Sequence, residues 1–442
     1  MAKAPSEAYN TTNREVECKL HIYFDGPEQE PVTIDKNNYL VSADVLEEAM
    51  ASSNTPWGNV SANELSFVLQ NDGDIFNPYN ASSILYGKIR SGIKVECFIR
   101  PLSTEDYDWD PLGVFYVIDW ITTAGGMTVD VTCYDKIKDV LGSQQVKMPV
   151  FRNITEKDFI QSFFDLLSVP VVIDDALTQT LPLGYILKEN KDILNDFIAG
   201  MCVFIFCDHL GEIKVQSMRK KLTTQHTITD DDQIVDIKAQ QGVSLDYDGV
   251  QIILKAPQLS SSIEILNMKD VKVPLEGVSF QASLFSSSPV AQIEMGANSK
   301  TGWGRFKIER ASSVDVDFKV ENLTEADFVD TLSLWGRVVE TSDTEWATEG
   351  TNLLKHDNIY CQTEERFESL KTFLTSFVRA SLPQIEVTVR GNPQFEIGQK
   401  MLVASTRFNI WFEGVLIRQK LRYDGGLSAD LTLLSSKILE VT

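Results

Sequence analysis

Cys207 and His209, with Asp208 between them, are the residues whose types come closest to a catalytic arrangement. A thiol beside an imidazole can act as a nucleophile with its general base. The same three residues also read as a polar turn after an apolar run, and side chains so close along the chain rarely reach a working geometry. We therefore expect a structural turn here and no catalytic residue.

Two glycine pairs, Gly125-Gly126 and Gly425-Gly426, raise the question of phosphate binding. A phosphate-binding loop needs a lysine and a hydroxyl residue after its glycines, at the start of a helix. Strand-like residues follow both pairs instead. Glycine adopts the positive φ that a tight hairpin requires, so we interpret both pairs as hairpin turns.

Metal and cofactor motifs are missing from the sequence. The acidic stretches at 71–74 and 230–232 lack EF-hand spacing, no CxxC occurs, and the four histidines fall outside zinc-binding spacing. No serine-hydrolase or zincin motif is present, and no glycosidase pair stands out among so many carboxylates. We expect no cofactor and no metal, and six buried, reduced cysteines.

The composition indicates a folded acidic protein. The chain has 442 residues, 43% of them hydrophobic, and a formal net charge of −23. It has no run of 18 apolar residues and no apolar stretch typical of a signal peptide. We expect synthesis in a cytosol and no membrane insertion. The negative charge argues against wrapping nucleic acid, and it suits a surface that must not retain a passing polyanion.

The two glycine pairs lie in similar surroundings, about 300 residues apart. Each pair precedes the pattern apolar, hydroxyl, small, Asp, apolar, Thr, apolar, and each follows a Gly with an apolar run, at Gly113 and Gly414. Such an internal repeat predicts two related modules. We expect 113–134 and 414–434 to form the same hairpin, each closing a β domain of like topology.

Four helices are predicted among the strands. One helix begins at Thr155. Two more, at 192–201 and 364–379, have one apolar face each, and the fourth, at 324–336, starts with a capping signal. Short alternating segments elsewhere predict strands. The fold class is therefore α+β, mainly β: two related small β-barrel or sandwich modules, an α/β domain between them, and an α-containing insert in the second module.

The expected domains follow from these segments. They are a flexible N-terminal arm at 1–14, a first β domain at 15–142, an α/β domain with linker at 143–232, a split second β domain at 233–280 plus 383–442, and an inserted α+β domain at 281–382. Splitting a module at a surface loop costs little, because loop-closure entropy grows slowly with length.

Eight short stretches, in chain order, carry a resemblance to a known family. They are ANELSF at 62–67, NPYN at 77–80, YGKI at 86–89, LGVFYV at 112–117, CYD at 133–135, NIYCQTE at 358–364, RGNPQFEIG at 390–398 and RQKL at 418–421. Together they resemble the hub proteins of phage tails and baseplates, from about residue 15 to 440. Unlike the longer members, this chain is expected to carry no lysozyme, peptidase or receptor-binding domain after the second β module.

The resemblance implies a structural protein of the virion tail, assembled in the host cytoplasm. Each subunit of such a hub gives two tube-like β domains, so a homotrimer forms a pseudo-sixfold ring on the sixfold tail tube. The implied partners are the tail tube protein, spike, fibre or other baseplate proteins, and the tape measure protein and DNA in the lumen during genome delivery. We expect structural roles for Gly125, Gly126, Gly425 and Gly426 in the hairpins and for Pro393 and Gly398 in the loop before the last strands.

Two other functions remain open at this stage. A tail-associated adhesin would bind glycans through clustered exposed aromatic side chains. A cell-wall hydrolase would need a carboxylate in a deep cleft. We expect neither, and no enzymatic activity.

Overall fold

The structure is a computed structural model of the full chain. It describes all residues outside 1–5, 10–14, 51–58, 103–106, 123–125, 144, 187–189, 220–221, 231–233, 239–246, 285–288, 295–300, 302, 313–314, 380–383 and 440–442. The expected arm at 1–14 falls largely outside the described residues.

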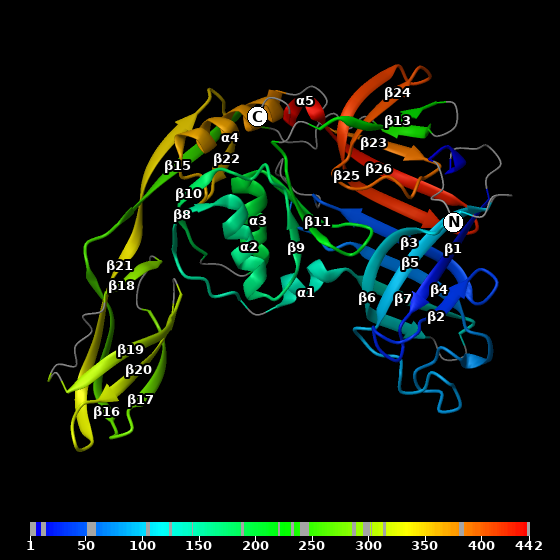
Figure 1. The fold of residues 1–442 in the computed structure, drawn as a ribbon. Coiled ribbons are helices and arrows are strands. Elements are labelled where there is room, and N and C mark those ends of the chain that lie inside the picture. Colours follow the sequence, from blue (N-terminus) through cyan, green and yellow to red (C-terminus); the bar gives the residue numbers. More distant parts are fainter. Residues whose placement is uncertain are drawn as a thin grey trace.

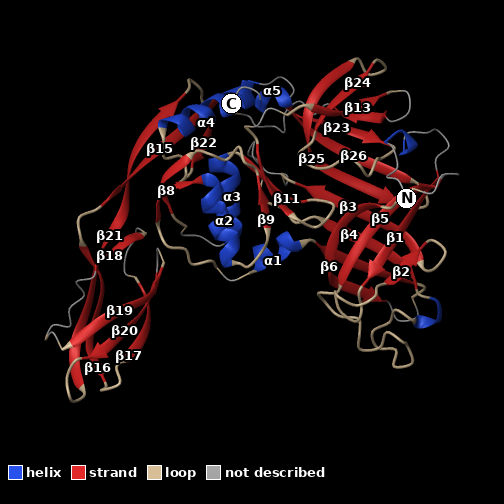
Figure 2. Ribbon diagram, in the orientation of Figure 1, coloured by secondary structure: helices blue, strands red, loops and turns tan. Residues whose placement is uncertain are grey.

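Two β modules lie side by side at one end of the molecule, a small α/β domain lies in the middle, and a long β arm projects at the other end (Figure 1). Strands dominate and helices are few (Figure 2). The predicted fold class, α+β and mainly β, is confirmed.

The first module is a curled sheet of seven strands in the order β3-β4-β7-β6-β5-β1-β2. Its strands are β1 (Glu15–Ile22), β2 (Val32–Asp35), β3 (Leu40–Glu48), β4 (Glu64–Gln70), β5 (Lys94–Leu102), β6 (Asp110–Thr122) and β7 (Thr128–Tyr134). In β1, Val16, Cys18, Leu20 and Ile22 are buried and the residues between them are not. This alternation places one face of the sheet in the core, as the sequence predicted.

The second module repeats this path with strands from distant parts of the chain, in the order β14-β23-β26-β25-β24-β13. They are β13 (Thr224–Thr229), β14 (Ile234–Lys238), β23 (Gln384–Val389), β24 (Lys400–Ser405), β25 (Ile410–Tyr423) and β26 (Leu427–Ser435). Two differences break the repeat: β13 pairs in parallel with β24, whereas β1 is antiparallel to β5, and among the described residues no strand of the second module corresponds to β2.

The two predicted hairpins are confirmed, and they match residue for residue. β6 pairs with β7 and β25 pairs with β26, both antiparallel. Each long strand has a bulge at the same place: Ile118 lies opposite the Thr132–Cys133 pair, and Ile417 opposite the Thr432–Leu433 pair. An equal register and an equal bulge indicate that both hairpins are copies of one design.

The bulge in β25 is where this strand changes its partner. Residues 410–415 pair with β24, and residues 418–423 pair with residues 43–48 of β3. We call this β25–β3 contact the module seam. It joins both modules into one 13-stranded sheet.

The α/β domain packs three helices beside short strands. Its elements are α1 (Lys136–Gly142), β8 (Phe151–Thr155), α2 (Glu156–Leu166), β9 (Val171–Ile173), β10 (Thr180–Gly184), α3 (Asn190–Met201), β11 (Val203–Cys207) and β12 (Ile213–Ser217). Thr155 caps α2 by accepting a hydrogen bond from the Asp158 amide, as predicted. Phe197 contacts both Phe159 and Phe163 edge to face in the core.

The arm is built on strand β21, which is 20 residues long. Its elements are β15 (Gly249–Leu259), β16 (Ile263–Val273), β17 (Val278–Ser283), β18 (Val290–Glu294), β19 (Gly304–Ala311), β20 (Asp315–Asn322), β21 (Phe328–Ala347) and β22 (Leu353–Asp357), followed by α4 (Glu364–Arg379) and, at the chain end, α5 (Ser436–Leu439). Of the segment 233–280, only β14 pairs in the large sheet, while β15, β16 and β17 pair with β20, β21 and β22.

The helix predicted at 324–336 is wrong. Most of this segment lies in β21, where Phe328, Leu332 and Leu334 are buried and pair along β16. The Thr324 hydroxyl donates to Ala326 O at 2.6 Å, so it stabilises a local turn and does not cap a helix. Pairing across the arm outweighed the local helical signal.

The structure also bears on the predictions for two helices, the cysteines and membrane spans. The helices at 192–201 and 364–379 are confirmed as α3 and α4. All six cysteines are buried and free. In the described residues, no helix is both long enough and apolar enough to cross a bilayer.

The two glycines of the second hairpin allow a matched test. Gly425 has φ +94, Gly426 has no positive φ, and an added Cβ would meet nothing within 4 Å at either position. We expect Gly425→Ala to lower the free energy of unfolding by about 1 kcal/mol, because an L side chain strains this backbone. Gly426→Ala serves as the control with little change. Equal losses in denaturant unfolding would contradict this account.

Candidate functional site

A group of buried polar residues lies where both β modules meet the α/β domain, and we call this place the junction. A turn between β11 and β12 carries His209 into it. The Asp208 carboxylate accepts the Leu210 and Glu212 amides, at 3.0 and 2.9 Å, and fixes this turn. Gly211 has φ +77 and packs on Val114 of the first module so closely that a Cβ would lie 2.7 Å from its side chain.

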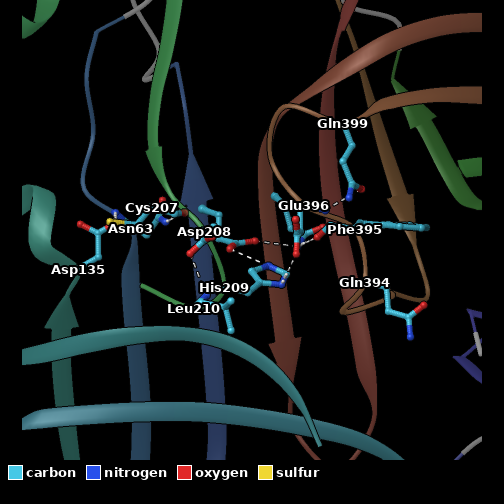
Figure 3. Close-up of polar contacts among 12 residues, drawn as sticks. Asn63, Asp135, Cys207, Asp208, His209, Leu210, Gln394, Phe395, Glu396 and Gln399 are labelled. Carbon is cyan, nitrogen blue, oxygen red and sulfur yellow. Dashed lines mark hydrogen bonds and ion pairs between the residues drawn. The ribbon is translucent and has the colours of Figure 1, made fainter. Parts of the chain in front are cut away.

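His209 is held between carboxylates from both modules, and Figure 3 shows it facing one of them, Glu396. Its Nε2 lies 2.9 Å from Oε1 of Glu47 on β3, and its Nδ1 lies 3.7 Å from Oε1 of Glu396, in the loop after β23. Gln419 of β25 donates to Glu47 Oε2 at 2.9 Å and to Phe395 O at 3.1 Å. The side chains of His209 and Glu47 are almost fully buried. Three parts of the fold thus converge on one ion pair.

The carboxylates decide the charge of His209. Burial by itself lowers the pKa of this imidazole, but the charge of Glu47, its contact with the ring and the charge of Glu396 together raise the pKa above its usual 6.5. The imidazolium is therefore stabilised in the folded protein. A buried pair of this kind favours one arrangement of the domains, because separating its partners would leave a charge in the interior.

A second buried group, Asn63, reinforces the junction. The backbone amide of Asn63 donates to Asp135 Oδ2 at 2.9 Å. Its side-chain Nδ2 donates to Cys207 O at 3.0 Å, and its Oδ1 accepts the Glu48 backbone amide at 3.0 Å. Asp135 also caps α1 by accepting the Ile137 amide. Burial raises the pKa of Asp135 to about 7 despite these hydrogen bonds.

This geometry supports a structural role and contradicts the nucleophile–base alternative. Figure 3 shows Cys207 facing Asp135 and His209 facing Glu396. Burial and the neighbouring Asp135 charge raise the pKa of the Cys207 thiol well above its usual value, so it stays protonated. Within the described chain, no group of three or more His, Cys, Asp or Glu residues is arranged to hold a metal ion.

The described glycines and the proline singled out from the sequence lie in three places. Gly425 and Gly426 form the tip of the β25–β26 hairpin, Gly126 precedes β7, and Gly125 lies outside the described residues. Pro393 and Gly398 lie buried in the loop between β23 and β24, which also carries Glu396. Gly398 has φ +84, and a Cβ there would lie 2.5 Å from the Gln216 amide oxygen of the α/β domain.

A groove of about 510 Å³ runs beside the junction, between the α/β domain and the loop that carries Gly398. Lys214 in this groove lies 3.1 Å from Asp208 and 2.8 Å from Glu212. Gln216 Nε2 donates to Gly398 O at 3.0 Å. Because these polar groups bind other protein groups, the groove is better explained as a domain contact than as a substrate site.

Two solved structures resemble this fold over nearly the whole chain. The 43 kDa tail protein of prophage MuSo2 from Shewanella oneidensis is 12% identical, with a TM-score of 0.53, and the match covers 96% of this chain and 100% of that one. The tail protein from Neisseria meningitidis MC58 is 8% identical, with a TM-score of 0.50, and coverages of 97% and 99%. The chain has the fold of phage tail proteins.

The similarity to phage tail proteins is found in the structure and not in the sequence. No protein-family model matches the sequence, and no curated protein matches it. The chain thus shares an architecture with tail proteins although few side chains are the same. The residues of the junction therefore have to be interpreted from their own contacts.

Sequence reasoning missed the partners of His209. Glu47 and Gln419 are 372 positions apart, on strands whose pairing has no local signal. A charged residue at the end of an alternating strand, such as Glu47 after the buried Val45, would have been the one available hint. The turn at Asp208 was predicted, but its role in carrying His209 between two modules was not.

Removing the imidazole should destabilise the junction. His209→Ala leaves Glu47 buried without its ion-pair partner, so we expect the free energy of unfolding to fall by about 3 kcal/mol. His21→Ala is the control, since His21 lies on the outer side of β1, 3.9 Å from Glu96. Denaturant titration measures both, and similar losses for the two variants would refute the assigned role.

Stability should also depend on pH. The pKa of His209 is raised in the folded state, so its contribution is complete below about 6.5 and is lost as the pH rises through the folded value. The pKa of Asp135 is raised from 3.8 to about 7, so ionising it also costs stability as the pH rises. We expect a lower free energy of unfolding at pH 8 than at pH 6. His209→Gln should reduce this difference, and an unchanged pH profile would count against the junction.

Proposed function

We propose that this protein is a structural hub of a phage tail or baseplate, rather than an enzyme. The support is the fold shared with two phage tail proteins over nearly their whole lengths. The arrangement of Cys207 and His209 adds to it, because the pair with the best catalytic prospects is engaged in domain contacts.

One observation carries the proposal: a single chain contains two β modules of the same strand order. Their hairpins share a register and a bulge, and the bulges of β3 and β14 also match, at Val41 and Val235. The modules are joined edge to edge in one sheet. A chain of this kind presents the same shape twice, side by side.

The repeat explains how a threefold object meets a sixfold one. In our proposal, three copies close into a ring, and their six modules give a pseudo-sixfold surface that matches the end of a tail tube. The α/β domain and the arm lie on the other side of the modules from the hairpin at Gly425, where they can dock spike, fibre or other baseplate proteins (Figure 1).

The polar face of the large sheet suits a channel. On the face opposite the core, the first module carries Asp44, Glu64, Asp119 and Asp130, each at least partly exposed, while Lys94 and Arg100 on the same face are paired with Glu96 and Glu17. Carboxylates repel phosphates, so a lumen lined by them lets DNA and the tape measure protein pass without trapping the DNA. We propose that this face lines the ring, in a virion tail assembled in the host cytoplasm.

Mass photometry on the full-length protein, alone and mixed with the tail tube protein of the same phage, tests the proposal. We expect a trimer, in the mixed sample at least, and rings with six similar lobes in electron micrographs. A strict monomer in both samples would refute the hub assignment. Clearing in a zymogram would favour a hydrolase, and binding on a glycan array would favour an adhesin.

A further inference from the structure

The outer end of the arm carries a group of exposed apolar side chains. The β16–β17 and β20–β21 turns form this end, far from both β modules (Figure 1). Leu275 and Leu323, one in each turn, are 56% and 57% exposed, and Trp303, just before β19, is 50% exposed. We call these three residues the arm tip. Apolar side chains that gather at one point of a surface, with a tryptophan among them, are typical of a contact with another molecule.

Hydrogen bonds between the turns hold the arm tip in one shape. Asn322 Nδ2 donates to Pro274 O at 3.1 Å and to Ala326 O at 2.9 Å, which ties one turn to the other. The Leu323 amide donates to Trp303 O at 2.8 Å. Because this surface is ordered beforehand, binding through it costs less conformational entropy.

The arm tip stands on a folded base. Val273 and Phe328, which pair at one end of β16 and β21, lie in a core cluster of the arm that is separate from the main core. The Trp303 ring packs edge to face against Phe328, with 6.0 Å between the ring centroids. The indole is thus anchored in the arm on one side, and its exposed part is available to a partner.

Acidic residues surround the arm tip. Glu276 and Glu325 are exposed, and neither forms an ion pair within the described chain. Lys272, near the end of β16, is already paired with Asp327, since its Nζ lies 3.2 Å from the carboxylate. Negative charge repels nucleic acid, an anionic bilayer and a second arm tip, and it attracts a basic surface. The partner that fits is therefore apolar at its centre and basic around it.

We propose that the arm tip docks in an apolar pocket with a basic rim on another protein of the tail or baseplate. This inference rests on the proposed hub function, and it names the contact surface of the arm and the chemistry of its partner. With 20 residues, β21 reaches up to about 65 Å, so it carries the tip well beyond the modules. A trimeric hub presents three tips, and three weak contacts to one partner assembly reinforce one another.

Cross-linking inside assembled virions tests the contact. Benzoylphenylalanine, a photo-reactive amino acid, replaces Ala326, an exposed residue beside the arm tip, in the full-length chain. This chain complements a phage that lacks its own copy, and mass spectrometry identifies the cross-linked peptides after irradiation. We expect cross-links to one other tail or baseplate protein, at a position flanked by Lys or Arg.

Charge reversal provides a matched comparison. Glu276→Lys combined with Glu325→Lys should lower the cross-link yield about tenfold, because an exposed charge pair changes affinity roughly twofold and each reversal replaces an attraction by a repulsion. Glu340→Lys combined with Glu349→Lys makes the same change in net charge at exposed positions in and after the second half of β21. This control should leave the yield unchanged, and both double variants should form trimers as the wild type does.

The outcomes separate the arm tip from the hub proposal. Virions without a cross-link, cross-links to lipid or to a second copy of this chain, cross-linked sites without basic residues, or equal losses from both double variants would each overturn the docking contact. Trimers in mass photometry would leave the hub proposal standing in all these cases. A wild-type protein that stays monomeric, with and without tail tube protein, would overturn the hub proposal itself.

Discussion

Backbone pairing between β25 and β3 is the contact on which the rest of the architecture depends. A strand has two edges, and β25 uses one for β26 along its length and divides the other between β24 and β3. The bulge at Ile417 supplies the local twist at which the partner changes. Without it, the modules would be two separate sheets, related to each other only through the α/β domain.

The junction helps to fix the angle between the two β modules. A sheet edge alone permits register slip, because every backbone pair along it is similar. Two contacts of Glu47 fix the register: His209 of the α/β domain forms an ion pair with it, and Gln419 of β25 donates a hydrogen bond to it. Their burial makes displacement costly, since a shift of one residue would leave a carboxylate in the interior. The α/β domain therefore acts as a brace across the two modules.

Distant proteins can share this architecture at about 12% identity because its requirements are mostly geometric. Strand order, hairpin register and bulge position are set by backbone hydrogen bonds and alternating burial, which many sequences satisfy. Side-chain chemistry is concentrated at the seam and the junction, where charges select partners. These are the places where this chain is expected to differ from others of the same fold.

The sequence alone determined the elements and the repeat. Alternation in β1 and the apolar faces of α3 and α4 are local periodicities, and the glycine pairs have a local backbone meaning, so each was readable from neighbouring residues. Pairing across the chain was decided only by the tertiary structure: β21 took a segment with a helix-capping signal, and Glu47 met His209 and Gln419. No local pattern encodes such contacts, because their free energy comes from burial and from strand partners hundreds of residues away.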